Sequence, residues 1–376
     1  MSSTGPTPPQ GPRAASSGTL DEVRELVESQ GLAFEPSFDD LATVYENGRL
    51  TACGARAGYV LKMLVVAPEH QGTDALGAVV TQLVQSAQGA GHDTVFVFTP
   101  PRNVPSFEAL NFRLLTAHGQ AALLEHGPGL EAYLAEQAAR ITPGNTGAVV
   151  VNGNPFTLGH LHLVRKAARQ VDRLYLFVVR EDRSVFPFDV RLRLAREATA
   201  GLASVTVLDT SRYAVSAGTF PSYFLKRLDQ AAQAQMRIDL QLFAQRLAPP
   251  FHIVARFVGQ EPLDPTTAAY NEMMAEVLPQ YGIRWVEVPR TEAGGAPISA
   301  SWVRRALAAG DLAGLDGLVP PPTLAYLRSE AALPVLRRLR DLKETVGQQQ
   351  NQREPKPAAT QLSVINWKAL ESEQKD

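Results

Sequence analysis

The segment Asn152–Leu161, NGNPFTLGHL, constrains the fold of this 376-residue chain more than any other. It follows the apolar run Gly147–Val151, which is typical of a buried strand, and it opens into Leu163–Ala168, whose composition indicates a helix. A strand that turns into a helix in this way directs free backbone N–H groups and the positive end of the helix dipole toward a bound anion. Gly159 would let backbone approach that anion, and His160 would supply a side-chain donor.

Strands and helices alternate around this segment, which predicts the α/β fold class with a doubly wound, Rossmann-like parallel sheet. The predicted strands cover residues 147–152, 174–180, 204–208, 253–258 and 284–288. Upstream lies a smaller α/β pattern with a hairpin at Asn47-Gly48. We therefore expect a disordered tail over 1–18, a first domain over 19–140, a second over 141–330, and a C-terminal helix with a polar tail over 331–376.

Composition excludes several classes of protein. The net charge of −2 argues against a general nucleic-acid binder, and no apolar stretch approaches the ~20 residues that span a bilayer. The Pro- and Ser-rich N-terminus lacks the apolar segment of a secretory signal, so we expect a cytoplasmic enzyme. The one cysteine, Cys53, allows neither an intrachain disulfide nor a cysteine-based metal site, and we expect it to be a packing residue.

Thr157, Gly159 and His160 form a Thr-x-Gly-His variant of the His-x-Gly-His signature of adenylyl- and cytidylyltransferases. These enzymes cleave a nucleoside triphosphate between its α and β phosphates. Attack on the α-phosphate builds negative charge on its equatorial oxygens, and fixed donors lower that barrier. We therefore predict that His160 and Thr157 are catalytic, and that Asn152, Asn154 and Gly159 bind ATP.

A second motif, ISASWVR, covers Ile298–Arg304. Taken alone, Ser299 is explained as a helix N-cap after Pro297. Two hydroxyls, a helix N-terminus and an arginine one turn later also form a clamp suited to the β and γ phosphates. The motif matches the Ile-Ser-x-Ser-x-x-Arg element that ends nucleotidyltransferase folds, so we predict that Ser299, Ser301 and Arg304 bind ATP.

Two further strand ends carry candidate ligand-binding residues. Arg180, Arg183 and Arg191 follow the second predicted strand, where ligands bind in sheets of this type. Any of them could reach phosphate, and we assign Arg183; a solvated charged loop is an equal alternative. Gly259 and Glu261 end the fourth strand. Gly259 would lie against the adenine base while Glu261 recognises a polar group, although a plain strand-end turn explains both residues nearly as well.

With these residues in view, the chain resembles the citrate (pro-3S)-lyase ligase family, also called acetate:citrate lyase ligase, over roughly residues 20–330. The TFPSYF segment, Thr219–Phe224, separates this family from other nucleotidyltransferases. The shared segments, in the family's order, are Asn152–Leu163, Arg180–Arg191, Thr219–Phe224, Phe257–Pro262 and Pro297–Arg304.

This resemblance implies a reaction. ATP, acetate and the thiol form of the citrate lyase acyl-carrier subunit would give AMP, pyrophosphate and the acetyl-thioester, which is the active lyase. The thiol belongs to a CoA-like prosthetic arm, and Mg²⁺ would accompany ATP. His160 would stabilise the α-phosphate transition state and Thr157 would hold a phosphate oxygen. Ser299, Ser301 and Arg304 would hold the departing pyrophosphate, and the chemistry of the fold suggests an acetyl-adenylate intermediate.

The N-terminal pattern resembles a GNAT acetyltransferase domain at Val65–Gly72 and Phe107–Phe112. In that fold, a glycine-containing turn presents backbone N–H groups to the pyrophosphate of CoA. Here Asp74 and Leu76 stand where glycine and a small residue are expected. A carboxylate repels pyrophosphate and a side chain blocks close approach of backbone, so we expect weak acetyl-CoA binding. The domain would dock the carrier's CoA-like arm or support the fold.

Three alternatives remain open from the sequence. A pantetheine-phosphate or nicotinamide-nucleotide adenylyltransferase would attack ATP with a phosphate and not with a carboxylate. A CoA-dependent GNAT enzyme with an inert second domain would bind acetyl-CoA tightly. A non-catalytic nucleotide sensor would lose nothing when His160 is replaced by alanine.

Overall fold

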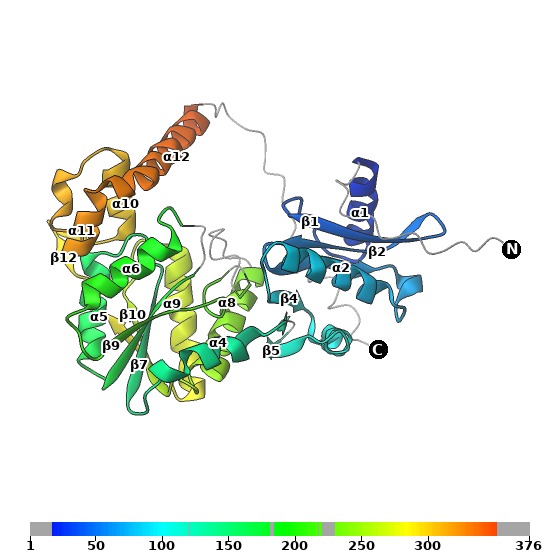
Figure 1. Ribbon diagram of the computed structural model, residues 1–376, viewed down its shortest axis with the longest axis horizontal. Coiled ribbons are helices and arrows are strands. Elements are labelled where there is room, and N and C mark those ends of the chain that lie inside the picture. Colours follow the sequence, from blue (N-terminus) through cyan, green and yellow to red (C-terminus); the bar gives the residue numbers. More distant parts are fainter. Residues whose placement is uncertain (1–16, 120, 181–183, 217, 220–229, 352–376) are drawn as a thin grey trace. The chain divides into compact units, whose positions relative to one another are not determined.

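A computed structural model describes residues 17–119, 121–180, 184–216, 218–219 and 230–351, and these form two compact units (Figure 1). The first unit holds the described residues up to Leu114, together with Leu124–Gly129. The second holds Leu115–Leu123 and the described residues from Leu130 onward. The division thus falls before the predicted boundary at residue 140. No helix in the described part of the chain combines the length and apolar character needed to cross a bilayer.

The N-terminal part builds a six-stranded sheet in the order β1-β2-β3-β4-β6-β5. Asn47 and Gly48 both adopt left-handed φ angles, 50° and 79°, between β1 and β2, so the hairpin prediction is confirmed. Short 3₁₀ turns lie at Pro68–His70 and Pro101–Asn103. The main elements are α1 Ser17–Ser29, β1 Asp40–Glu46, β2 Arg49–Ala57, β3 Val60–Val66, α2 Ala75–Gly89, β4 Val95–Thr99, α3 Val104–Glu108, β5 Arg113–His118 and β6 Ala121–His126.

Helix α1 packs its apolar face on this sheet. Val23 and Val27 are fully buried against Cys53 and its neighbours on β2 and β3. Burial raises the pKa of the Cys53 thiol to about 12, so this residue packs as a small apolar side chain. Helix α1 begins at Ser17, two residues inside the segment predicted to be disordered.

The second unit contains a five-stranded sheet in the order β11-β10-β7-β8-β9, with every neighbouring pair parallel. All five predicted strands are present, and the α/β prediction is confirmed. The strands are β7 Thr146–Val151, β8 Arg173–Val178, β9 Val205–Asp209, β10 Ile253–Gly259 and β11 Arg284–Val288. A small hairpin follows, with β12 at Glu292–Ala293 and β13 at Ala296–Pro297.

Helices cover both faces of this sheet (Figure 1). Ala255 and Phe257 of β10 join the core beneath α5 (Leu158–Ala168) and α6 (Phe188–Thr199), whereas Arg256 lies over Phe243 and Tyr270 on the opposite face. This alternation follows from the two-residue period of a strand. The helices are α4 Gly129–Gln137, α5 Leu158–Ala168, α6 Phe188–Thr199, α8 Gln230–Leu242, α9 Pro265–Val277, α10 Ala300–Ala308, α11 Pro321–Leu327 and α12 Leu333–Asn351. Shorter helical turns lie at Ala138–Arg140, Phe243–Leu247, Leu278–Tyr281, Ala313–Leu315 and Glu330–Ala332.

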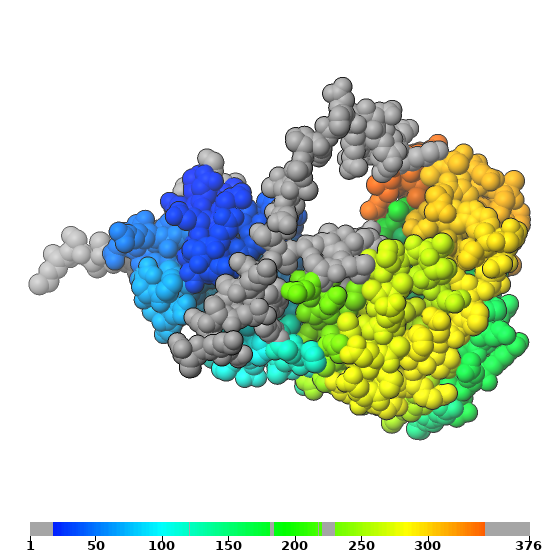
Figure 2. Space-filling view, turned by 180° about the vertical axis from the view of Figure 1, so that it is seen from behind, coloured from blue at the N-terminus to red at the C-terminus, as the bar shows by residue number. Residues whose placement is uncertain are grey.

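The C-terminal helices complete the core under α5 and α6. Val303 of α10 and Leu327 of α11 are buried in the same hydrophobic cluster as Val164 of α5. The yellow-to-orange segments in Figure 2 form one continuous packed surface of this unit. Helix α12 lies in the segment predicted to hold a C-terminal helix, and the short helix α11 precedes it, because the chain leaves the helical conformation at Ser329.

Candidate active site

The predicted site residues follow three neighbouring strands. Strand β7 ends at Val151, β10 at Gly259 and β11 at Val288. Because these strands are parallel and adjacent, the loops that follow them lie on one edge of the sheet. This carboxyl edge is where open α/β sheets bind their ligands, so the loops have the right position for a shared site.

Thr157 and His160 cap the first turn of α5 reciprocally. Thr157 Oγ1 accepts from the His160 N–H at 3.4 Å, and the Thr157 N–H donates to His160 Nδ1 at 3.0 Å. Since Nδ1 accepts a backbone proton, the neutral imidazole carries its own proton on Nε2. Phe156 stacks on the ring with centroids 5.3 Å apart and fixes its plane. None of the described residues accepts a hydrogen bond from Nε2, which leaves this N–H as an oriented donor.

His160 is neutral at physiological pH. Burial lowers its pKa to about 4, although the side chain keeps some exposed surface, and the nearby guanidinium groups of Arg290 and Arg304 add to the effect. The imidazole therefore provides a directed N–H without a charge of its own. The positive charge around it comes from the two arginines.

Asn152 is occupied in building the loop. Its side-chain oxygen accepts from Ser184 Oγ at 3.0 Å and from Arg191 Nη1 at 3.0 Å. The fully buried Arg191 also donates to the backbone oxygens of Asn152 and Val179 at 2.8 and 2.6 Å. Arg191 thus joins the ends of β7 and β8 from within the fold and does not act as a solvent-facing phosphate ligand.

Asn154 connects the loop before α5 to the segment Arg180–Arg191 and to the second motif. Its side-chain oxygen accepts from the Phe186 N–H at 3.1 Å, and its backbone oxygen accepts from Arg304 Nη1 at 2.6 Å. The predicted ligand Arg183 lies outside the described residues. Arg180, its alternative, has its guanidinium 5.0 Å from the centre of the Phe188 ring.

The second motif begins α10 and contacts the first. Ser299 is the N-cap, with its Oγ accepting from the Trp302 N–H at 3.1 Å, as the N-cap interpretation predicts. Arg304 donates to Ser301 Oγ at 2.9 Å while its other terminal nitrogen holds Asn154, 150 residues away in the sequence. The structure therefore brings the two predicted motifs together.

Two glycines of the site differ in what surrounds them. A Cβ at Gly159 would lie 2.9 Å from the backbone oxygen of Ile298, so glycine allows the second motif to pack directly on the first turn of α5. We expected Gly159 to accommodate a ligand; the atom that it accommodates is protein backbone. At Gly259 the nearest atom to such a Cβ is Leu163 Cδ2 at 3.9 Å, which leaves space beside the end of β10.

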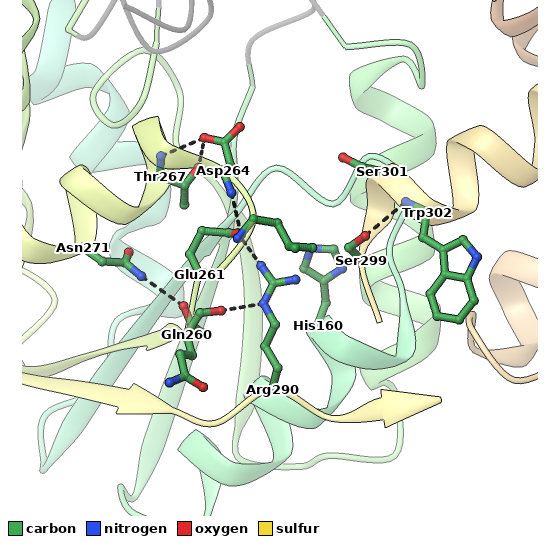
Figure 3. A network of polar contacts seen from close by, with 12 residues as sticks. His160, Gln260, Glu261, Asp264, Thr267, Asn271, Arg290, Ser299, Ser301 and Trp302 are labelled. Carbon is green, nitrogen blue, oxygen red and sulfur yellow. Dashed lines mark hydrogen bonds and ion pairs between the residues drawn. The ribbon is translucent and has the colours of Figure 1, made fainter. Parts of the chain in front are cut away.

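Glu261 and Arg290 form an ion pair beside His160 (Figure 3). Glu261 Oε1 accepts from the backbone N–H groups of Leu263 and Asp264 at 2.9 and 3.1 Å, and its Oε2 pairs with Arg290 Nη2. Both carboxylate oxygens are therefore engaged within the protein, whereas we expected Glu261 to recognise a ligand.

Arg290 was not among the residues predicted from the sequence. It follows β11 by two residues, so the strand-end rule that identified Gly259 and Glu261 would also have identified Arg290 had it been applied to the last strand. The family segment Thr219–Phe224, by contrast, lies outside the described residues except for its first member.

The second unit is thus an α/β domain whose parallel sheet brings polar and cationic side chains together at its carboxyl edge. The family described as "Citrate lyase ligase C-terminal domain" matches residues 146–327. The chain is 41% identical to the citrate (pro-3S)-lyase ligase of Klebsiella pneumoniae over 286 residues, which are 74% of this chain and 84% of that protein. It is 34% identical to the ligase of Escherichia coli (strain K12), over 82% of this chain and 90% of that one.

The chain therefore belongs to the citrate lyase ligase family, as its sequence predicts, and it is an enzyme. Among solved structures, pantoate–β-alanine ligase (pantothenate synthetase) from Thermus thermophilus aligns with 57% of this chain and 75% of its own, at 18% identity and a TM-score of 0.33.

Proposed function

We propose that this enzyme uses ATP to transfer acetate onto the CoA-like thiol arm of the citrate lyase acyl-carrier subunit, in the cytoplasm, and so activates the lyase. One observation carries the proposal: Arg304 joins the start of α10 to the loop before α5, so that the His160 N–H and the second motif face one edge of the sheet. This is the arrangement that cleavage of a triphosphate between its α and β phosphates requires.

In the first step, a carboxylate oxygen of acetate attacks the α-phosphorus of ATP. A phosphorus–oxygen bond forms, the bond to the bridging oxygen breaks, and pyrophosphate leaves with the electron pair. The His160 Nε2–H donates to an equatorial oxygen of the α-phosphate, where negative charge increases in the transition state. The product is acetyl-adenylate.

In the second step, the carrier thiolate attacks the acetyl carbonyl carbon. A carbon–sulfur bond forms and AMP leaves with the electron pair of the carbon–oxygen bond. Acetyl-adenylate is a mixed anhydride, so the energy of ATP cleavage is retained for making the thioester. The carrier thiolate therefore needs no further activation of acetate when it reaches the site.

The start of α10 is our candidate for the pyrophosphate. The Ser299 and Ser301 oxygens each accept one internal hydrogen bond, and no acceptor among the described residues takes their O–H protons. Arg304 uses one N–H on each terminal nitrogen internally and keeps others for phosphate. Mg²⁺ would enter with ATP. In the described ranges, no group of three or more acidic, histidine or cysteine residues could hold a metal ion, so phosphate oxygens and water would supply most of its ligands.

The test is to incubate the pure protein with ATP, labelled acetate and thiol-form citrate lyase, and to measure AMP, labelled carrier and lyase activity. We expect all three to appear together, and none of them without acetate. Adenylylation of pantetheine phosphate or of nicotinamide mononucleotide, with no acetate-dependent AMP, would identify the protein as an adenylyltransferase and contradict the proposal.

A further inference from the structure

The guanidinium of Arg290 is fixed by the protein on one side only. Its Nε–H donates to the backbone oxygen of Gln260 and one Nη2–H pairs with Glu261. Within the described ranges nothing accepts a hydrogen bond from Nη1. A guanidinium carries five N–H donors in a planar fork, so the outer edge of Arg290, with parallel Nη1–H and Nη2–H groups, remains available. The side chain is 20% exposed, and Glu261 behind it is 12% exposed.

This outer edge lies beside the predicted reaction centre. The charge of Arg290 acts on the imidazole of His160, and in Figure 3 that ring lies between the Arg290 guanidinium and the Ser299 hydroxyl. Ser299 belongs to the start of α10, where we place the leaving pyrophosphate. We therefore place the nucleophile on the Arg290 side of the imidazole, away from the leaving group.

The chemistry of the first step requires a group on that side. In-line displacement at phosphorus brings the nucleophile in opposite the leaving group. The nucleophile here is a carboxylate approaching an anionic phosphate, and its negative charge must be balanced before the two can approach. A planar guanidinium matches a carboxylate with two parallel hydrogen bonds and fixes its direction as well as its charge.

We propose that Arg290, oriented by Glu261, binds the carboxylate of acetate and directs it at the α-phosphate of ATP. This inference rests on the proposed function and supplies the carboxylate contact that the sequence left unassigned. Arg290 exchanges no proton in the step; its two N–H groups hold the two carboxylate oxygens, and one of these oxygens attacks phosphorus with a lone pair that the fork leaves free. Glu261 is a positioning residue, because it holds the guanidinium and contacts no substrate.

The experiment separates the two substrates. We would measure acetate-dependent exchange of labelled pyrophosphate into ATP for wild-type protein, Arg290→Ala and Arg290→Lys, and ATP binding without acetate by calorimetry. Hydrogen bonds to a charged group contribute about 1.5–3 kcal/mol, so Arg290→Ala should raise the KM for acetate roughly 10- to 150-fold. We expect its ATP affinity to change by less than about threefold. Arg290→Lys keeps the charge and loses the fork, and should give an intermediate KM.

Glu261→Gln tests the positioning role. The glutamine oxygen can still accept from the Leu263 and Asp264 N–H groups, whereas the charge that holds Arg290 is lost. The acetate KM should rise by less than in Arg290→Ala. The matched control is the exposed pair Arg237–Glu276 in the same unit, joined at 2.7 Å. Glu276→Gln should leave both KM values unchanged.

Two results would overturn the inference. If Arg290→Ala folds, as judged by circular dichroism, and weakens ATP binding with the acetate KM unchanged, the guanidinium is a phosphate ligand. If Arg290→Ala does not fold and Arg290→Lys leaves the acetate KM unchanged, no fork is needed and the inference is equally wrong. Wild-type protein without any acetate-dependent exchange contradicts the proposed function itself.

Discussion

The chain presents two strand–turn–helix segments with a glycine in the turn, one before α5 and one before α2, and only the first has the surroundings of an anion site. At α5 the cap residue Thr157 is hydrogen-bonded to His160, and two arginines approach it, Arg290 from the loop after β11 and Arg304 from α10. At α2 the N-cap is the exposed Asp74, whose side chain makes no capping hydrogen bond. A helix N-terminus favours anions in both places. The comparison teaches that cations from distant parts of the chain, and not the local motif alone, distinguish the two helix starts.

The largest expected effect is that of removing the α5 donor. His160→Ala should lower the rate of AMP formation by about 10²–10³-fold, the usual cost of losing one transition-state donor, with folding retained. The matched control is His162→Ala, two residues further on the same helix, which should leave the rate unchanged. Equal rates in wild type and His160→Ala would favour the nucleotide-sensor alternative and remove the distinction between the two helix starts.

The two glycines of the site, Gly159 and Gly259, give the next effect. Gly159→Ala places a Cβ 2.9 Å from the Ile298 oxygen and should lower the free energy of unfolding by about 1–3 kcal/mol, because α10 must move away. In Gly259→Ala the nearest atom to the added Cβ is 3.9 Å away, so this variant should have the same free energy of unfolding as the wild type. Urea denaturation measures both. A Gly159→Ala protein as stable as Gly259→Ala would show that the contact between the two motifs is not tight.

Stability should depend on pH through His160. Its folded pKa is about 4 against an ordinary value of 6.5, so between these values the unfolded chain binds a proton that the folded protein does not. The contribution of His160 to the free energy of unfolding is therefore fully present above pH 6.5 and is lost as the pH falls toward 4. The free energy of unfolding of wild type minus that of His160→Gln should therefore decrease as the pH is lowered from 6.5 to 4. A constant difference would mean that the imidazole titrates normally and is not buried among cations.

The smallest effects concern the α2 segment. Titration calorimetry of wild-type protein with acetyl-CoA should give no tight binding, because the Asp74 carboxylate repels pyrophosphate. Asp74→Gly should leave the ATP- and acetate-dependent rate unchanged. Tight acetyl-CoA binding by the wild type would place a second anion site at α2 and remove the contrast on which this account depends.

The sequence predicted those features of the fold that are decided locally. The strands of the second unit are short apolar runs, and Ser299 is an N-cap that the next three residues determine. The pair β5 and β6 was missed, because Arg113–His118 and Ala121–His126 are brief and carry little alternation. Strand prediction is weakest for such segments.

The roles of individual site residues could not be predicted in the same way. Glu261 pairs with Arg290, Arg304 pairs with Asn154, and Arg191 is buried under the loop that holds Asn152. Each contact joins residues that are far apart in the sequence, and no local pattern specifies which partner a charged side chain will find. Ligand binding was assigned to Glu261, whose carboxylate is engaged internally, while Arg290 was overlooked.

The most direct test of the account is a crystal structure of the protein with α,β-methylene-ATP, which cannot be cleaved between the α and β phosphates. We expect the α-phosphate within hydrogen-bonding distance of His160 Nε2, and the β and γ phosphates at Ser299, Ser301 and Arg304. A triphosphate bound elsewhere on the protein, or bound at this edge with its γ-phosphate toward Arg290, would contradict the account.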